Sequence, residues 1–153
     1  MMDRKVIVFA LMTAALLFFI WGHSLSPINV SDGESRSLMG WIKPLLDPDG
    51  RLDDELFHHY LRKAAHFCEF AALGICMGGL FQNLPLKKSK RAVLFAFGAC
   101  VLAAVVDECI QLFNPGRGPR ISDVLLDSCG ALLGIALMML LFHMIHKRNK
   151  AAA

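Results

Sequence analysis

Four stretches of this chain are apolar enough to cross a bilayer, and three of them carry ionisable residues near one end. A membrane-spanning helix needs about 20 mostly apolar residues, and such runs occur at 6–22, 61–82, 92–113 and 123–146. A charge at the centre of a bilayer costs roughly 3 kcal/mol or more, so ionisable residues within spans usually face a bundle interior and serve a function. We therefore place the function at the depth that these residues share.

The composition predicts a single membrane domain. Of the 153 residues, 56% are hydrophobic, and the mean hydropathy is +0.50; a soluble multi-domain protein is excluded. We predict an all-α fold, an integral membrane four-helix bundle over residues 1–150, with an external loop at 23–60. The terminal alanines 151–153 look like a remnant of cloning.

The first span is predicted to be a retained helix. Arg4 and Lys5 precede its apolar run, as in a signal peptide. No small-residue cleavage site follows, however, and Trp21-Gly22 is typical of an exit at the membrane interface.

Basic residues predict the orientation of the spans. Lys and Arg are in excess in cytoplasmic segments, and with four spans every cluster of basic residues flanking a span falls on one side. The members of these clusters are Arg4, Lys5, Lys87, Lys88, Lys90, Arg91, Lys147, Arg148 and Lys150. We expect a multi-pass protein of the bacterial cytoplasmic membrane with both termini cytoplasmic and the ionisable layer in the outer leaflet. The net charge of +3 follows from this asymmetry, so nucleic acid is not expected as a partner.

The external loop holds an amphipathic segment. Apolar residues from Leu38 to Leu46 recur at helical spacing beside Trp41, which is typical of a helix lying in the headgroup plane. Residues 47–50 (Asp-Pro-Asp-Gly) predict a turn. The acidic run 53–55 predicts the first turn of a helix that leads into the second span.

Ionisable and polar residues in and after the last three spans form the candidate binding site. They are Arg62, His66, Glu69, Asp107, Glu108, Gln111, Arg117, Arg120, Asp123 and Asp127. Within each span most members recur three or four residues apart, so they share one helix face; Asp107 and Glu108 point about 100° apart and should play different parts. At about 1.5 Å per residue, His66 and Asp107 lie at comparable depths. Gly130 and Gly134 permit the close helix approach that would bring the faces together.

Three blocks of these residues resemble the VanZ-like membrane family. They read Arg62-Lys-x-x-His66-Phe-x-Glu69, Asp107-Glu-x-x-Gln111-x-Phe-x-Pro-Gly-Arg117 and Asp123-Val-x-x-Asp127-x-x-Gly130, and His23-Ser-x-Ser26 is similar to the family's serine-rich end of the first span. The resemblance runs from about Trp21 to Gly134. It implies a link to resistance against teicoplanin-type glycopeptide antibiotics in Gram-positive bacteria, without naming the chemistry. The family usually has Asn where this chain has Asp127, which puts a role for a neutral amide there in doubt.

The first interpretation of the site is binding of a polar headgroup. The ligand would be a membrane lipid, a lipid-linked cell-wall precursor or a lipid-tailed glycopeptide antibiotic. Arg62, Arg117 and Arg120 would bind phosphate or carboxylate, because the guanidinium group matches these anions in a bidentate way. The Gly and Pro residues around Arg117 would keep that loop tight.

The second interpretation is a hydrolase or transferase that acts on a lipid. His66 would be the general base or acid, tuned by Glu69, with Asp107 or Asp127 as a proton partner. Serine hydroxyls are available, but none sits in a nucleophile-elbow motif.

The third interpretation is structural: the charges nearly balance, and such a network could hold the helices in register. Against it, small-residue packing suffices to join helices in a bilayer. The sequence leaves these alternatives, and the oligomeric state, open.

No metal or cofactor is expected. Oxygen ligands from Asp107, Glu108, Asp123 and Asp127 would suit Mg²⁺ or Ca²⁺, but their spacing is not diagnostic of a metal site. The five cysteines lack a CxxC or paired-His pattern and are best explained as packing residues.

Overall fold

The computed structural model describes residues 3–84, 90–114, 118 and 120–151, and within these ranges the chain forms five α-helices. They are α1 (Arg4–Leu25), α2 (Ile28–Leu46), α3 (Asp54–Asn83), α4 (Lys90–Gln111) and α5 (Ile121–Ala151). Helices α1, α3, α4 and α5 are long and apolar enough to cross a membrane. The predicted all-α membrane fold with four spans is confirmed.

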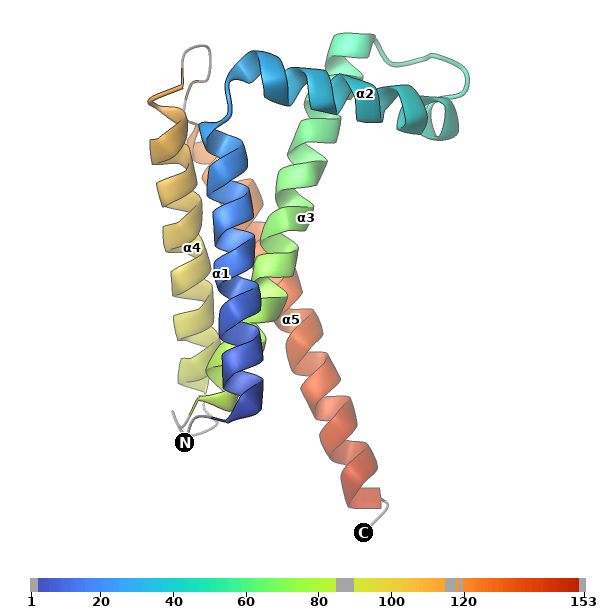
Figure 1. Ribbon diagram of the computed structural model, residues 1–153. Helices are drawn as coiled ribbons and strands as arrows, with labels where there is room; N and C mark the ends of the chain where they lie inside the picture. The colour runs from blue at the N-terminus through green and yellow to red at the C-terminus, as the bar shows by residue number, and fades with distance from the viewer. Residues whose placement is uncertain (1–2, 85–89, 115–117, 119, 152–153) are drawn as a thin grey trace.

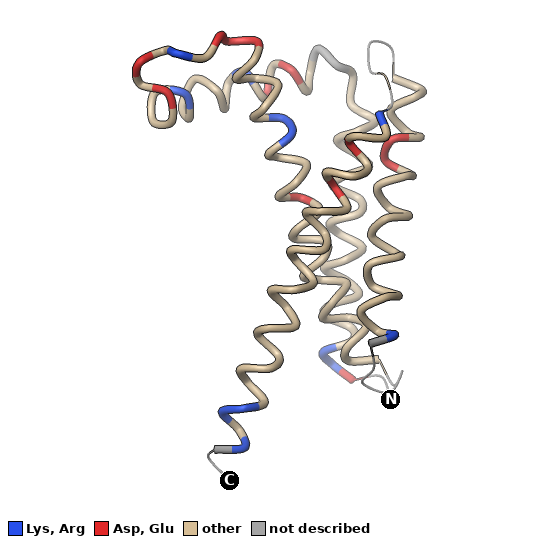
Figure 2. The backbone as a smooth tube through the Cα atoms, turned by 180° about the vertical axis from the view of Figure 1, so that it is seen from behind, with Lys and Arg blue, Asp and Glu red and all other residues tan. Residues whose placement is uncertain are grey.

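Four helices stand upright and the fifth lies across one end of them. Helices α1, α3 and α4 run alongside one another, α5 slants past α3, and α2 crosses the top of the bundle (Figure 1). Both termini lie at the opposite end. We call these two ends the α2 end and the terminal end. Asp and Glu gather in the half toward α2, whereas the terminal end carries mainly Lys and Arg (Figure 2).

Glycines bring the backbones of α3 and α5 into direct contact. A Cβ atom added to Gly134 would lie 1.9 Å from the carbonyl oxygen of Ala71, and one added to Gly130 would lie 2.4 Å from that of Phe67. Gly74 of α3 is restricted in the same way by the α5 backbone. Any larger side chain at these positions would force the two helices apart, so their spacing and register depend on glycine.

Helices α1 and α4 complete the bundle through apolar contacts and one long-range hydrogen bond. Ile20 of α1 is buried together with Phe70 of α3 and Cys100 of α4. The Trp21 indole N–H donates to the Ala103 carbonyl oxygen at 3.3 Å. Trp21 is therefore held against α4, and α1 continues beyond the interfacial exit that the sequence predicted there.

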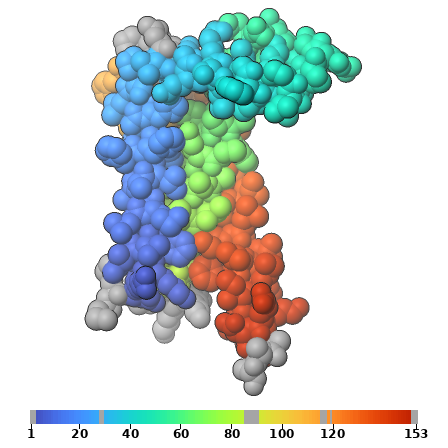
Figure 3. Space-filling model, turned by 45° about the vertical axis from the view of Figure 1, so that its right-hand side comes forward, coloured from blue at the N-terminus to red at the C-terminus, as the bar shows by residue number. Residues whose placement is uncertain are grey.

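Helix α2 is longer than the amphipathic segment that the sequence predicted. It begins at Ile28, after Pro27 at the N-cap, rather than near Leu38. Proline suits a helix start because its fixed φ is helical and the first N–H groups need no intrahelical acceptor. Trp41 and Leu45 remain 79% and 80% exposed, and α2 projects from the bundle as a shelf (Figure 3). That α2 lies in the headgroup plane stays a prediction, based on its apolar side chains and its position across the bundle.

The turn and the acidic helix start between α2 and α3 form as predicted. The Gly50 N–H donates to the Asp47 carbonyl at 3.1 Å, and Gly50 has a φ of 63°, which glycine adopts without strain. The Asp53 side chain caps α3 by accepting from the Glu55 N–H at 3.1 Å. Because this cap lies at residue 53, α3 starts one to two turns ahead of the span predicted at 61–82.

We predict that Gly134→Ala destabilises the protein by about 2–3 kcal/mol, since its new methyl group would overlap backbone atoms that cannot move aside. The measurement is helix loss by far-UV circular dichroism as SDS is titrated into protein in a mild detergent. The matched control is Gly98→Ala on α4, where an added Cβ meets nothing within 4 Å. Equal stability of the two variants would show that the glycine contact does not set the helix spacing.

Candidate functional site

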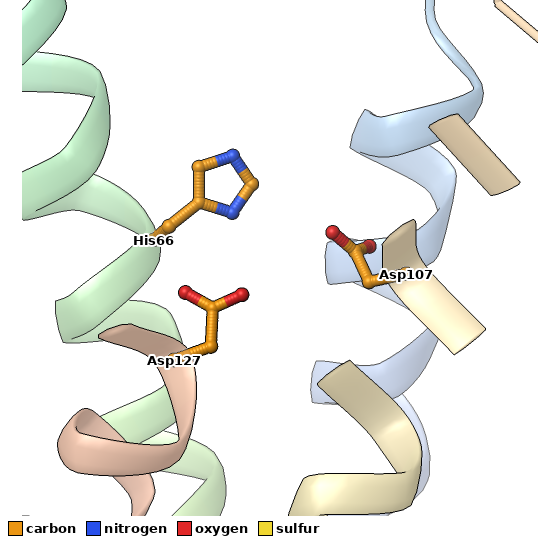
Figure 4. A group of neighbouring side chains, drawn as sticks. All are labelled: His66, Asp107 and Asp127. Atoms are coloured by element: carbon orange, nitrogen blue, oxygen red, sulfur yellow. The ribbon is translucent and has the colours of Figure 1, made fainter. Parts of the chain in front are cut away.

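His66 of α3, Asp107 of α4 and Asp127 of α5 converge on one point inside the bundle (Figure 4). One ligand atom from each residue lies within 4.8 Å of the others. Asp107 is 0% exposed and Asp127 is 1% exposed. The sequence predicted that these residues share one depth in three spans, and in the structure their side chains also lie close together. We call His66, Asp107 and Asp127 the buried trio.

The glycine contact of α3 and α5 explains how two members of the trio meet. Gly130 touches the carbonyl of Phe67, the residue after His66, and Asp127 lies one turn before Gly130. Because the two backbones are close at this level, the His66 and Asp127 side chains, which lie just toward the α2 end from it, face each other. Asp107 joins them from α4, beside the small buried side chains of Ala103 and Ala104, which let α4 approach.

Gln111 orients Asp107. Its side-chain amide donates to Asp107 Oδ2 at 2.9 Å, one helical turn away on the same face of α4. The other oxygen, Asp107 Oδ1, is buried without a hydrogen-bond partner, as is Asp127 Oδ1. Both acids therefore present an unsatisfied oxygen in the interior. Such groups are rare in folded proteins because leaving them without a partner costs stability.

Glu69 lies between two histidines. Its Oε2 is 3.8 Å from His66 Nδ1, and its Oε1 is 4.0 Å from His23 Nδ1. His23, at the end of α1, also approaches Glu34 at 3.6 Å and Ser31 Oγ at 3.3 Å. His23 was not among the predicted site residues, although its position at the end of the first span places it near the depth of the trio.

A cavity of about 330 Å³ lies on the α2 side of the trio. Two of the trio residues, His66 and Asp127, take part in its lining. The full lining is Asp32, Glu55, His58, His59, Arg62, Lys63, His66, Glu108, Gln111, Gly118, Arg120, Asp123, Leu126 and Asp127. The cations of the lining come from α3 and from the residue before α5.

Two cations of the cavity are held by ion pairs. Arg62 contacts Asp32 of α2 at 2.9 Å, and Lys63 contacts Asp123 of α5 at 2.5 Å. All four side chains are partly exposed, which leaves donor N–H groups available to a ligand. These ion pairs also join α2 and α5 to the half of α3 that lies near the α2 end.

Glu108 and Arg120 have a structural relation that the sequence did not suggest. The backbone N–H of Arg120 donates to Glu108 Oε2 at 2.8 Å, which fastens the start of α5 to α4. Glu108 thus has its partner outside the trio, and its contact differs from those of Asp107. The Arg120 side chain is exposed and lines the cavity. Arg117 lies outside the described residues.

His58 and Asp32 line the cavity but were absent from the predicted set. His58 is 5% exposed, and its Nε2 has no hydrogen-bond partner. The spacing could have identified it, because His58 precedes Arg62 by four residues on the face that continues to His66. No comparable signal marks Asp32, which reaches the cavity only because α2 folds back over the bundle.

The cysteines do not join the trio. Cys68, Cys109 and Cys129, which fall near its depth in the sequence, are all exposed on the outside of the bundle. The group of three metal-binding residue types found among the described residues contains only His66, Asp107 and Asp127.

A comparison with protein-family models agrees with the motifs that the geometry brings together. The model described as VanZ/LLP1 matches residues 6–143, which include all four spans and the buried trio. Searches among curated proteins and among solved structures found no significant match. The chain belongs to the VanZ/LLP1 family of membrane proteins.

Proposed function

We propose that the cavity binds the phosphate-bearing headgroup of a lipid. The observation that carries this proposal is the cavity of about 330 Å³ at the end of the apolar spans, lined by Arg62, Lys63 and Arg120. Its volume is at the lower end of the range for small-molecule sites, about 300–1,000 Å³. A headgroup fits such a space while its acyl or isoprenoid tail stays in the bilayer beside the helices.

The position of α2 supports a ligand from the membrane rather than from water. Trp41, Leu45 and Leu46 are exposed on α2, and such side chains anchor a helix at the headgroup level. A cavity just beneath that level is within reach of lipid headgroups. Lys and Arg would recognise the phosphate, because charge-assisted hydrogen bonds to phosphate are among the strong ones.

We propose the outer leaflet as the side of binding, because the terminal end carries the basic residues that mark the cytoplasmic side. Candidate ligands there are a phospholipid, a lipid-linked wall precursor or a lipid-tailed glycopeptide. The last two connect with the teicoplanin resistance that the family resemblance implies. Nucleic acid has no place in this proposal.

A lipid hydrolase or transferase is the second candidate, and the convergence of His66 with Asp107 and Asp127 favours it. The serine hydroxyls do not support a serine nucleophile. Ser26 and Ser128 donate to carbonyls of their own helices, and no serine is among the described residues that line the cavity. Chemistry at this site would therefore use water rather than a covalent serine intermediate.

A purely structural role accounts for the site less well. Such a network would satisfy its own polar groups and enclose no space. Instead a cavity is present, and Asp107 Oδ1 and Asp127 Oδ1 have no hydrogen-bond partner.

We predict that the purified protein retains a phosphate-bearing lipid in native mass spectrometry after gentle extraction from its own membrane. Replacing both Arg62 and Lys63 by Gln should lower lipid occupancy by at least about tenfold, because each charge-assisted contact contributes about 1.5–3 kcal/mol. The matched control is Arg36→Gln, which removes an exposed cation of α2 that pairs with Glu55 and does not line the cavity. A double variant that retains lipid like the wild type would refute headgroup binding in this cavity.

We predict that alanine at His66, Asp107 or Arg117 leaves the yield in detergent size exclusion unchanged but abolishes any resistance phenotype. A functional site can be lost without loss of the fold, whereas a structural clamp cannot. Aggregation of all three variants would therefore support the structural interpretation.

We predict that a C-terminal green fluorescent protein fusion is fluorescent and that an alkaline phosphatase fusion at the same place is inactive. The first folds only in the cytoplasm and the second only outside it. The opposite pair of results would place the cavity in the inner leaflet.

A further inference from the structure

Two buried acids of the trio have no described cation beside them. Lys63 contacts Asp123 and Arg62 contacts Asp32, and no ion pair joins a described Lys or Arg to Asp107 or Asp127. Ionised carboxylates are costly to bury unless a positive charge accompanies them. Their unpartnered Oδ1 atoms are on the two residues that, with His66, converge on one point.

We propose that His66, Asp107 and Asp127 bind one divalent transition-metal ion, of the Mn²⁺ or Zn²⁺ class, at the floor of the cavity. The ion would supply the two positive charges that balance the two carboxylates. Imidazole nitrogen together with carboxylate oxygen suits this class of ion better than Ca²⁺ or Mg²⁺, which prefer oxygen ligands alone.

The geometry of the trio is close to that of a binding site. The three ligand atoms lie within 4.8 Å of one another, and ions of this class bind nitrogen and oxygen at about 2.0–2.2 Å. An ion at the centre would therefore draw the side chains inward by roughly 1 Å or less, which side-chain rotation allows. Because the ligands come from three helices, binding would also lock α3, α4 and α5 together.

Neighbouring groups support two of the ligands. Gln111 already holds Asp107 Oδ2 and leaves Oδ1 for the ion. Glu69 lies 3.8 Å from His66 Nδ1, and a carboxylate beside the second ring nitrogen is a common partner of a metal-bound histidine. Both supports lie on the same helix as the ligand they orient.

The four carboxylates that the sequence offered as oxygen ligands for a metal were Asp107, Glu108, Asp123 and Asp127. As a set they suit a metal less well than the trio does. Asp123 is paired with Lys63, and Glu108 accepts the backbone N–H of Arg120. These two carboxylates therefore already have partners, while Asp107 and Asp127 each keep an oxygen available.

An ion with three protein ligands has open coordination positions. His66 and Asp127 line the cavity, so those positions would face the space assigned to the headgroup. A phosphate oxygen of the lipid would complete the coordination, with Lys63 and Arg62 on its other side. The ion itself depends only on the trio, whereas its contact with a lipid phosphate rests on the proposed function.

The test is a titration of Mn²⁺ into full-length, tag-free protein in detergent after chelator treatment, followed by electron paramagnetic resonance and checked by elemental analysis. We expect one ion per chain. Asp107→Asn and Asp127→Asn, which keep the side-chain shape, should each weaken binding by at least about 100-fold. Asp54→Asn is the matched control: it makes the same change at an exposed carboxylate of α3 that pairs with Lys43 and does not line the cavity, and it should bind like the wild type.

A spectroscopic signal tests the histidine separately. Bound Mn²⁺ should show nitrogen modulation of its electron spin echo, and His66→Gln should abolish the modulation. Circular dichroism of every variant establishes that a loss of binding is not a loss of the fold.

The outcomes separate the metal site from headgroup binding. The metal site would be overturned if the wild type bound no stoichiometric ion, if the two trio Asn variants bound it as tightly as the wild type, or if only Asp54→Asn lost it. Lipid retention by chelated protein together with any of these results would leave headgroup binding intact. One bound ion that depends on the trio, with no lipid retained by any form, would support the metal site and refute the lipid proposal.

Discussion

The contact of bare backbone between α3 and α5 determines where this protein can carry a site. In a bilayer, polar side chains are tolerated inside a bundle only where helices enclose them. Gly130 and Gly134 bring α5 against α3 so closely that no side chain fits between them. Just toward the α2 end from this contact, His66 and Asp127 face each other, and Asp107 of α4 closes the third side. Toward the terminal end, the cores of the spans hold no acidic or basic residue, so the polar interior is confined to the half near α2.

Five acids of the site fall into two groups that need different explanations, while Glu69 lies apart from both, between His66 and His23. Asp32 and Asp123 are paired with cations, and Glu108 accepts a backbone N–H, so these three fasten α2 and the start of α5. Packing and register account for them. Asp107 and Asp127 hold the deepest positions and keep an oxygen without a partner. Stability alone does not account for that arrangement, because satisfied or apolar side chains would be more favourable there.

Sequence periodicity predicted the parts of the structure that depend on one helix at a time. It identified the spans, the shared polar faces and the pair Gly130 and Gly134. It did not predict how α2 folds back, because the contact of Asp32 with Arg62 joins helices that the chain connects through a turn. The sequence likewise did not show which acids meet: Glu108 and Asp107 are neighbours in the chain, yet only Asp107 converges with His66 and Asp127. The roles of the predicted site residues in binding remain predictions.

Residue 127 decides the charge of the buried trio. With the Asn that the family resemblance leads one to expect there, Glu69 and Asp107 would be the carboxylates near His66. With Asp127 a further negative charge enters the same enclosed space, while the neighbouring cations Lys63 and Arg62 are engaged by other acids. The site must then take up either a further proton or a divalent cation. A proton satisfies the charge but binds only one oxygen, whereas a metal ion binds one oxygen from each acid together with the imidazole. The geometry of three ligand atoms around one point therefore favours the ion as the partner of this particular chain.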